Sequence, residues 1–337
     1  MRTRMPQITQ IPGRGCHAHV LVGMLLTLSL SCDRSSIQTT PTVKHVVIVS
    51  VDGLRPDMML RTNTPCMKWL MRRGCYTMWA RTTEVSITLP SHVSMLTGVI
   101  PERHGIWWNI ELDKEYQRFP SVPTIFELAK ARGLTTALAV GKGKLEALGK
   151  PGSLDWAYWP DGYAQANQVA EEAGNIIQQH RPQLFFIHFP DVDAAGHGSG
   201  WGSRQQVAAV EKCDQALGMV INSLRRAGIW EQTAIIVTSD HGGAGYSHGP
   251  DDMRSRNIPW IIAGPTIRHG IDLTTKDTLI VNTEDTFATA CYFLNIPIDE
   301  DIDGKAILQV LEEFKPEEEL LVDTTDEKTE GHLPYKP

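Results

Sequence analysis

Five short apolar runs alternate with longer amphipathic segments along this chain of 337 residues. Each run has apolar residues on both faces and ends at Gly, Asp or Pro, as buried parallel strands of about four to eight residues do. This alternation constrains the fold more than any other feature of the sequence. The five runs are His45–Val51, Leu134–Val140, Leu184–Phe189, Ala234–Ser239 and Ile258–Gly264.

The segments between the runs have the periodicity of helices. Two of them end in Gly74 and Gly133 after basic residues, which is typical of a helix C-terminus. Strands alternating with helices predict an α/β sandwich in which helices flank one central, mainly parallel sheet. The helical patterns are TPCMKWLMRRG, TIFELAKARG, NQVAEEAGNIIQQH and RQQVAAVEKCDQALGMVINSLRRAG.

The composition is that of a soluble globular protein. Hydrophobic residues make up 42% and charged residues 21% of the chain, and its net charge is -7. A mildly acidic chain lacks the basic surface of a general nucleic-acid binder, so we expect no nucleic-acid polymer as a partner.

The N-terminal segment has the pattern of an export signal. Arginines precede the apolar run VLVGMLLTLSLSC, which is shorter than the ~20 residues that span a bilayer. Small Ser31 directly before Cys32 resembles a lipoprotein signal, although Ser29 stands where Leu is usual. We expect residues 1–32 to be a signal peptide, with Cys32 as the lipidated residue and the protein periplasmic or membrane-anchored. Plain secretion and a cytosolic chain with a buried N-terminus are the alternatives.

Residues 44–312 are expected to form the catalytic domain, and residues 315–337 a charged, flexible tail. In an oxidising compartment Cys66 and Cys75 are close enough in sequence to pair across a short loop. Cys213 and Cys291 have the pattern of thiols in the core of helices.

Polar residues follow four of the apolar runs. In an open α/β sheet the carboxyl ends of parallel strands meet at one edge, and ligands bind there. We therefore expect these side chains to lie together. They are Asp52 after the first run, Lys142 and Lys144 after the second, Asp193 and His197 after the third, and Asp240, His241 and His248 after the fourth.

Three converging carboxylates repel one another unless cations neutralise them. A single Asp after a strand is most often a helix cap, and a single His is most often on the surface or in the core. Three carboxylates and three histidines at one edge instead divide naturally between two divalent metal ions. Mixed oxygen and nitrogen ligands favour Zn²⁺, with Mn²⁺ as the alternative. Such metal pairs are a recurring device for displacement at phosphorus.

The segment Thr82–Asn109 offers a nucleophile for such a centre. Thr88 stands before LPSH at the start of a helical stretch that ends at Gly98. Its hydroxyl is placed either to cap this helix or to act as a nucleophile, since a bound metal lowers the pKa of a hydroxyl.

These motifs together resemble the alkaline phosphatase superfamily, in its type I phosphodiesterase/nucleotide pyrophosphatase branch. The resemblance covers about residues 44–300 and rests on VSVDGLRPD, ITLPSHVSMLTGVIPERHGI, DAAGH, TSDHGG and SHGPDD. It implies an alkaline-phosphatase-like fold and a two-metal phosphoesterase that forms a covalent threonine intermediate. One metal would be held by Asp52, Thr88, Asp240 and His241, the other by Asp193, His197 and His248, and Asn109 would contact the substrate phosphoryl oxygen.

Three features depart from the family pattern. Ser91 stands where Asn is common, and Asp191 competes with Asp193 as a ligand, although Asp193 has the family's spacing to His197. The chain is also short for the family, which leaves its nucleotide preference open.

The bond that is cleaved remains open between two classes. VGKGKLEAL resembles lysine-bearing segments of phosphate monoesterases and phosphonoacetate hydrolases, where paired cations neutralise a doubly charged phosphoryl group. In that case Lys142 and Lys144 bind substrate; otherwise they are solvated turn residues. Thr88 disfavours the sulfatase and phosphoglycerate mutase branches, which use other nucleophiles. An exported ligand-binding protein that retains the fold is the non-enzyme alternative, but no ligand of the set is missing. We therefore expect an enzyme acting on a small phosphate ester.

Overall fold

The computed structural model describes residues 42–112, 118–249, 252–276, 279–298 and 301–313. Its centre is an eight-stranded sheet with the order β4-β3-β5-β1-β6-β7-β2-β8. The predicted signal segment with Cys32 and the predicted tail 315–337 lie outside the described residues. The strands are β1 (His45–Val51), β2 (Gly74–Arg81), β3 (Thr136–Val140), β4 (Trp156–Tyr158), β5 (Leu184–Phe189), β6 (Thr233–Thr238), β7 (Asn257–Ala263) and β8 (Ile271–Asp272).

The sheet is mainly parallel, as the sequence predicts. Strand β1 lies between β5 and β6 and is parallel to both, and β3 is parallel to β4 and β5. The run at 258–264 was expected to be another parallel strand, and this is wrong, because β7 is antiparallel to β6 and β2. A parallel connection needs a crossover, usually a helix. Between β6 and β7 the only described helix is α9 (Met253–Arg256), so the chain turns back along its neighbour.

Strand β2 was not predicted, and its first residue, Gly74, looks like the end of a helix because it follows basic residues. Helix α2 (Pro65–Arg73) runs directly into it, and Gly74 has an extended φ of -154° rather than the left-handed conformation of a cap. A Cβ on Gly74 would come within 1.9 Å of the Ile262 carbonyl oxygen, so glycine here permits close approach of β7. Gly133, by contrast, has the expected left-handed φ of +74°.

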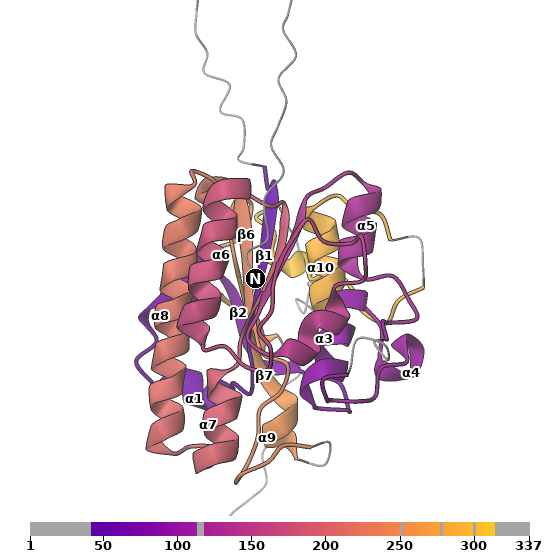
Figure 1. Ribbon diagram of the computed structural model, residues 1–337. Helices are drawn as coiled ribbons and strands as arrows, with labels where there is room; N and C mark the ends of the chain where they lie inside the picture. Colours follow the sequence, from indigo (N-terminus) through magenta and orange to yellow (C-terminus); the bar gives the residue numbers. More distant parts are fainter. Residues whose placement is uncertain (1–41, 113–117, 250–251, 277–278, 299–300, 314–337) are drawn as a thin grey trace, which may run out of the picture. The chain divides into compact units, whose positions relative to one another are not determined.

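Helices cover both faces of the sheet (Figure 1). Those that pack on one face include α1 (Pro56–Arg61), α2, α6 (Ala166–His180) and α8 (Arg204–Arg226). Those on the other include α3 (Thr88–Thr97), α5 (Ile125–Ala131) and α10 (Asp285–Phe293). Shorter elements are α4 (Pro101–His104), α7 (Asp191–Ser199), η2 (Gly143–Leu148), η3 (Trp230–Gln232), η4 (Leu273–Thr275) and η5 (Leu308–Val310).

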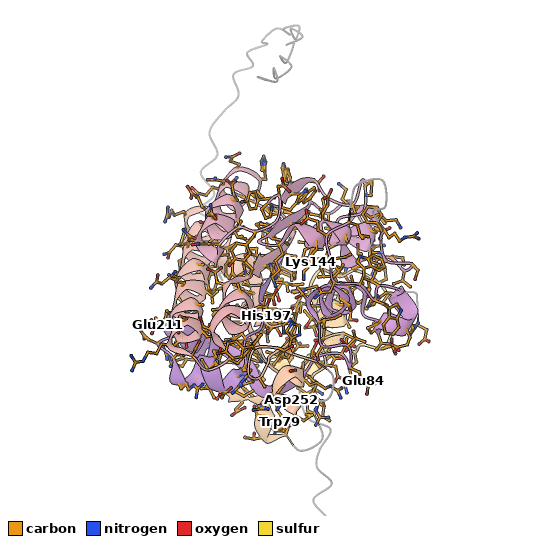
Figure 2. The ribbon with its side chains drawn as sticks, turned by 60° about the horizontal axis from the view of Figure 1, so that its bottom comes forward. Trp79, Glu84, Lys144, His197, Glu211 and Asp252 are labelled. Carbon is orange, nitrogen blue, oxygen red and sulfur yellow. The ribbon has the colours of Figure 1, made fainter. Side chains whose placement is uncertain are left out.

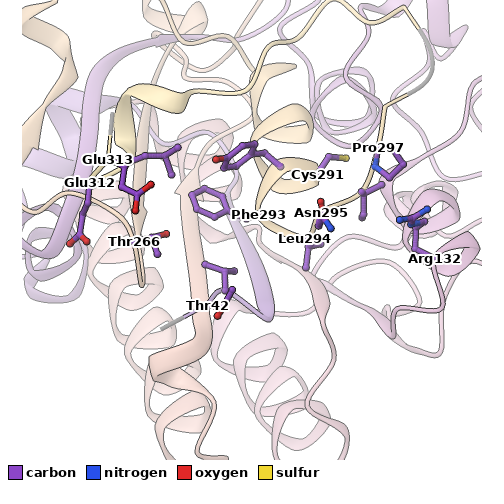
Figure 3. A pocket seen from close by; sticks show the side chains of 14 residues that line it. Thr42, Arg132, Thr266, Cys291, Phe293, Leu294, Asn295, Pro297, Glu312 and Glu313 are labelled. Carbon is purple, nitrogen blue, oxygen red and sulfur yellow. The ribbon is translucent and has the colours of Figure 1, made fainter. Parts of the chain in front are cut away.

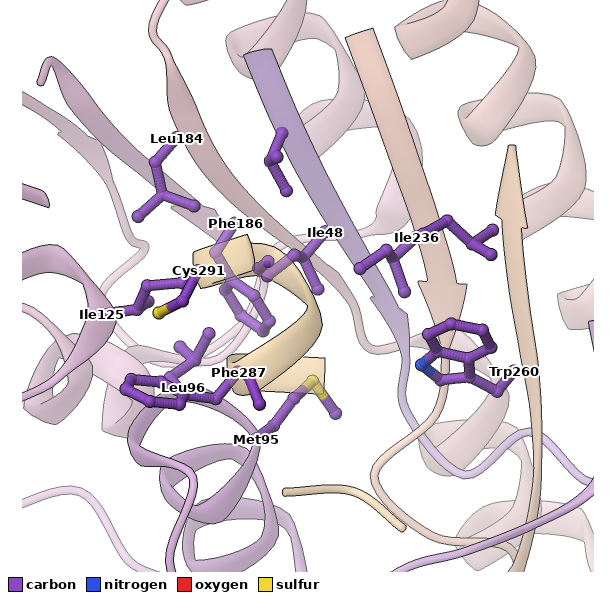
Figure 4. Packing of buried hydrophobic residues seen from close by; sticks show 14 of the residues in the cluster. Ile48, Met95, Leu96, Ile125, Leu184, Phe186, Ile236, Trp260, Phe287 and Cys291 are labelled. Carbon is purple, nitrogen blue, oxygen red and sulfur yellow. The ribbon is translucent and has the colours of Figure 1, made fainter. Parts of the chain in front are cut away.

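Two hydrophobic cores, one on each face, explain why the strands are apolar throughout. Alternate residues of β1 point to opposite faces, so Val46 and Ile48 join one core while Val47 and Val49 join the other. Figure 4 shows the first core, where Ile48 lies among residues of β5, α3 and α10. Burying such side chains stabilises the fold by about 1.5–3 kcal/mol each.

No helix among the described residues is long and apolar enough to span a membrane.

Cys66 and Cys75, which are near enough in sequence to pair, are both free thiols in this structure. Cys75 belongs to one core, whereas Cys66 packs against the other, on the opposite face of the sheet. Cys213 in α8 and Cys291 in α10 are buried, which confirms their prediction as helix-core thiols.

Candidate metal and phosphoester site

The candidate site lies where the parallel strands β1, β3, β5 and β6 end. Asp52 and Asp240 follow β1 and β6, which are neighbouring strands inside the sheet. Lys142 and Lys144 follow β3. Asp193 lies in the first turn of α7, which begins directly beyond β5. Figure 2 turns this end of the molecule forward and shows Lys144 and His197 on it. The sequence-predicted residues therefore meet at one edge of the sheet.

Three histidines present the same ring nitrogen to the site. The Nδ1–H groups of His241, His248 and His197 donate to the backbone carbonyls of Gly242, Ser86 and Tyr246, over 2.8, 2.8 and 2.9 Å. A ring with a proton on Nδ1 carries a lone pair on Nε2, so each histidine offers Nε2 as a ligand. Anchoring of the second ring nitrogen is the usual arrangement of metal-binding histidines.

The carboxylates complete the ligand set. The Nε2 atom of His241 lies 3.4 Å from Asp52 Oδ1 and 3.3 Å from Asp240 Oδ2. On the other side, Asp193 Oδ1 lies 3.3 Å from His197 Nε2 and 3.8 Å from His248 Nε2. These three oxygens are buried and accept no hydrogen bond from the described residues.

Buried oxygens without donors are costly unless a cation binds them. The residues present therefore fit metal ions. One group of candidate ligands is Asp193, His197 and His248, as the sequence predicts. The other contains Asp52, His241 and again Asp193, so Asp193 stands between the two groups, while Asp240 approaches the second through His241.

Lys142 is part of this cluster rather than a solvated turn residue. Its Nζ lies 2.7 Å from Asp52 Oδ2 and 2.6 Å from Asp193 Oδ2. The two carboxylates thus give one oxygen to the ammonium group and keep Oδ1 for the site. Burial opposes the charge of Lys142, but Asp52 and Asp193 outweigh it and raise the pKa of its ammonium group above the usual value.

The electrostatics of the carboxylates differ. Burial raises the pKa of Asp52, but Lys142 and His188 outweigh it and hold this pKa well below its usual range. Burial and the neighbouring Asp52 charge instead raise the pKa of Asp240 well above its usual range. Burial lowers the pKa of His241 to about 4, so its ring is neutral at physiological pH, as a metal ligand must be.

The structure also separates Asp191 from Asp193. One Asp191 oxygen accepts the backbone N–H of Ala166 over 2.7 Å and so caps helix α6. Asp193 alone of the pair approaches His197 and His248. Asp191 is therefore bonded to α6, and Asp193 is the better placed of the two to act as a ligand.

Thr88 is the first residue of helix α3, and its side chain makes no capping hydrogen bond. Its buried hydroxyl Oγ1 lies 3.5 Å from Nε2 of His241, inside the ligand cluster. Ser91, one of the departures from the family pattern, turns away and donates to the Asp240 carbonyl over 2.7 Å. The structure thus brings Thr88, not Ser91, to the candidate metal ligands.

Asn109 lies against the start of the same helix. Its Oδ1 accepts the Leu89 backbone N–H over 3.0 Å and the Lys144 ammonium over 2.8 Å. Because both donors bind Oδ1, the Nδ2 group of Asn109 is left to donate to another molecule. Burial and nearby Lys142 lower the pKa of Lys144.

Sequence reasoning missed three buried polar residues behind the site. Ser50, His92 and His188 are fully buried, and none was expected to have a role. The one signal was weak, since His188 is the only polar residue in its apolar run and Ser50 the only hydroxyl in its own.

A large pocket belongs to another part of the fold. It has a volume of about 740 Å³ and is lined by residues such as Thr42, Arg132 and Phe293 (Figure 3). Thr42 precedes β1, so this pocket is at the opposite end of the strand from Asp52, and it contains none of the candidate ligands. A smaller hollow of about 210 Å³ adjoins the site and is lined by Lys142, Lys144 and Glu111.

The sheet and its flanking helices, with the Asp/His cluster at the carboxyl edge, form an alkaline-phosphatase-like α/β fold. Among solved structures, an inactive variant of murine ectonucleotide pyrophosphatase/phosphodiesterase 5 in complex with AMP is similar, with a TM-score of 0.66 and 15% identity. The match covers 80% of this chain and 100% of that chain. More particularly, the chain belongs to the type I phosphodiesterase/nucleotide pyrophosphatase family, whose model matches residues 46–255.

Curated relatives agree with this assignment. Ectonucleotide pyrophosphatase/phosphodiesterase family member 5 of Homo sapiens is 24% identical over 65% of this chain and 48% of its own length. A bis(5'-adenosyl)-triphosphatase of Bos taurus is 25% identical over 64% of this chain and 50% of its own length. The chain thus spans about half the length of the curated relatives that it matches.

Proposed function

We propose that this protein is a metal-dependent hydrolase of phosphodiester or pyrophosphate bonds, with Thr88 as its nucleophile. The observation that supports it most is the convergence of three unpartnered carboxylate oxygens and three Nε2 lone pairs, with the Thr88 hydroxyl beside one of them, Nε2 of His241. Family membership and the AMP bound to the murine relative support a nucleotide ester as substrate.

The protein prepares Thr88 through its position. The hydroxyl is at the first turn of α3, where the helix dipole favours a developing negative charge on oxygen. The Thr88 side chain is also buried, so a phosphoryl group that reaches its hydroxyl is shielded from bulk water. The ligand set would hold two ions, with Asp52, Asp240, His241 and Thr88 around one and Asp193, His197 and His248 around the other. When bound, Zn²⁺ or Mn²⁺ would supply the Lewis acidity that lowers the pKa of hydroxyl groups and neutralises phosphoryl charge.

Asn109 and Lys144 would orient the phosphoryl group. Because Lys144 and the Leu89 N–H fix Oδ1 of Asn109, its Nδ2 donor is held in one direction beside Thr88. A fixed donor stabilises charge that develops on a phosphoryl oxygen in the transition state. In this proposal Thr88 attacks phosphorus, the leaving group departs as an alcohol or phosphate, and water then hydrolyses the phosphothreonine ester.

A second candidate function is hydrolysis of phosphate monoesters or phosphonoacetate-like compounds. It is favoured by the two lysines, since Lys142 and Lys144 line the hollow beside the site. Lys142 is already engaged by two carboxylates, however, which leaves Lys144 as the cation nearer to Asn109. One additional cation is adequate for a diester, which carries one charge less than a monoester.

The two functions are separated by assaying three substrates on Zn²⁺-loaded protein. These are p-nitrophenyl phosphate, bis-p-nitrophenyl phosphate and p-nitrophenyl thymidine monophosphate. We expect the thymidine diester to be hydrolysed with the highest kcat/KM and chelation to abolish the activity. A preference for the monoester would support the second candidate. Binding without turnover of any of them, at full metal content, would favour the ligand-binding alternative. Attachment to a membrane through Cys32 remains a separate proposal, tested by mass spectrometry of the mature N-terminus.

A further inference from the structure

Two buried histidines stand behind the candidate site without facing it. His92 in α3 and His188 in β5 are both fully buried, and their rings are in edge-to-face contact with centroids 5.0 Å apart. Neither belongs to the groups of candidate ligands formed by the described residues. A buried imidazole needs partners for both nitrogens, so these partners define what each ring does.

His188 holds Asp52. The backbone N–H of Gly141 donates to Nδ1 of His188 over 3.3 Å, so the ring proton is on Nε2. This Nε2–H donates to Asp52 Oδ2 over 2.9 Å. The same oxygen accepts Lys142, and the other oxygen of Asp52 is the one that faces His241. His188 therefore fixes which carboxylate oxygen of Asp52 is presented to the site.

His92 holds the nucleophile's backbone and has the opposite tautomer. Its Nδ1 lies 2.7 Å from the Thr88 carbonyl oxygen, which can only accept, so Nδ1 carries the proton. Asp240 Oδ2 lies farther from the same nitrogen, at 3.5 Å, and forms no hydrogen bond with it. The Nε2 lone pair then accepts the hydroxyl of Ser50 over 2.8 Å, and Ser50 lies on β1 two residues before Asp52. His92 therefore joins the first turn of α3 to β1.

We propose that His188 and His92 are positioning residues with separate tasks, His188 orienting Asp52 toward its metal and His92 orienting Thr88 toward phosphorus. This inference rests on the proposed function, because it takes Asp52 as a metal ligand and Thr88 as the nucleophile. Loss of the group that orients a metal ligand typically weakens metal binding 10- to 100-fold. Displacement of a reacting group by about 1 Å lowers the rate by about 100-fold.

The test uses amide substitutions that imitate one ring nitrogen at a time. The side-chain amide of Gln reaches about as far as Nε2, and that of Asn about as far as Nδ1. We expect His188→Asn to weaken Zn²⁺ affinity by about 10- to 100-fold in competition with a chelator, and His188→Gln to restore most of it. At position 92 we expect Asn, rather than Gln, to be the substitution that retains function, because the ring proton of His92 is on Nδ1. His92→Gln should lower kcat at saturating Zn²⁺ by about 10- to 100-fold, a larger factor than its effect on Zn²⁺ affinity, and His92→Asn should restore much of kcat.

The matched control is His45→Gln. His45 is a buried histidine at the start of β1, the strand that Asp52 follows, and its Nδ1–H donates to the Pro182 carbonyl over 2.9 Å. Its substitution should lower stability and change neither metal affinity nor kcat of the folded protein. Equal effects of Gln and Asn at position 188 or at position 92 would overturn the inference. It would also be overturned if the same parameter, either Zn²⁺ affinity or kcat, changed most at both positions.

A second measurement needs no variant that might fail to fold. Nitrogen-15 spectra of the histidine rings in the full, unsubstituted chain should show a proton on Nε2 of His188 and on Nδ1 of His92. The opposite tautomer at either position would overturn the inference. The proposed function fails by different results, namely full metal binding by Asp52→Ala or full activity of Thr88→Ala.

Discussion

Replacement of Gly53 by Ala tests how closely the site is packed. Gly53 follows Asp52, has a left-handed φ of +77°, and donates its N–H to Asp240 Oδ1 over 3.1 Å. A Cβ at this position would lie 2.9 Å from the Asp193 Cα and 3.1 Å from its backbone nitrogen. Gly53 is thus linked to all three carboxylate residues of the site. It is the chain neighbour of Asp52, it is hydrogen-bonded to Asp240, and it packs closely on the backbone of Asp193.

The magnitude follows from two contributions. A side chain in the left-handed conformation costs about 1–2 kcal/mol. The contact with Asp193 is with backbone, which cannot rotate away, so Asp193 must also move. A displacement approaching 1 Å would lower kcat/KM by about 100-fold. We therefore expect Gly53→Ala to lose stability, Zn²⁺ affinity and activity together.

Gly133 supplies the matched control. Its φ is +74°, nearly that of Gly53, but a Cβ there would meet nothing within 4 Å. Gly133→Ala should therefore show only the conformational strain, a decrease in Tm of a few degrees at about 2–4 °C per kcal/mol, with normal metal content and activity. Thermal unfolding with and without chelator, metal analysis and kinetics compare the two variants. Indistinguishable behaviour of the two alanine variants would show that the close approach of Gly53 to Asp193 is not present in solution.

Three further predictions concern other residues. Asp191→Ala should lose about 1 kcal/mol of stability, because it removes the cap of α6, while Zn²⁺ binding persists; Asp193→Ala should lose Zn²⁺ instead, and metal analysis with thermal unfolding distinguishes the two. Lys144→Met should lower kcat more than it weakens Zn²⁺ binding, because Lys144 contacts Asn109 and not the candidate ligands; the reverse order would contradict its assignment. Burial raises the pKa of Glu284 to about 7, so the folded state holds this proton more tightly than the unfolded state, and stability falls as pH rises from about 4.5 to about 7. Urea unfolding of the unsubstituted protein should show a fall on the order of 3 kcal/mol in the free energy of unfolding across this range, and Glu284→Gln should abolish that fall. If the variant shows the same pH dependence as the unsubstituted protein, the raised pKa of Glu284 is refuted.

Much of the site was predictable because parallel strands impose order on the sequence. Asp52 and Asp240 each follow an apolar strand directly, so the topology alone brings them to one edge. The spacing between Asp193 and His197 is a local helical property and needs no tertiary information, since residues four apart share a helix face.

The remainder depended on contacts between distant segments. The direction of β7 is set by pairing with β6 and β2, which its apolar residues do not encode. Cys66 and Cys75 are near in sequence, yet the sheet separates them. The partners of Lys142 likewise come from β1 and α7, so its lysine-rich turn could not reveal that it binds carboxylates.

In the proposed function Thr88 attacks phosphorus and becomes covalently attached to it. A phosphodiester that is chiral at phosphorus, such as a phosphorothioate ester, distinguishes this route from a single displacement by water. Two successive displacements, first by Thr88 and then by water, should give products with retained configuration, and Thr88→Ala should lower the rate by several orders of magnitude, about the scale seen for an essential catalytic residue. Inverted configuration, or a near-normal rate for Thr88→Ala, would contradict the account.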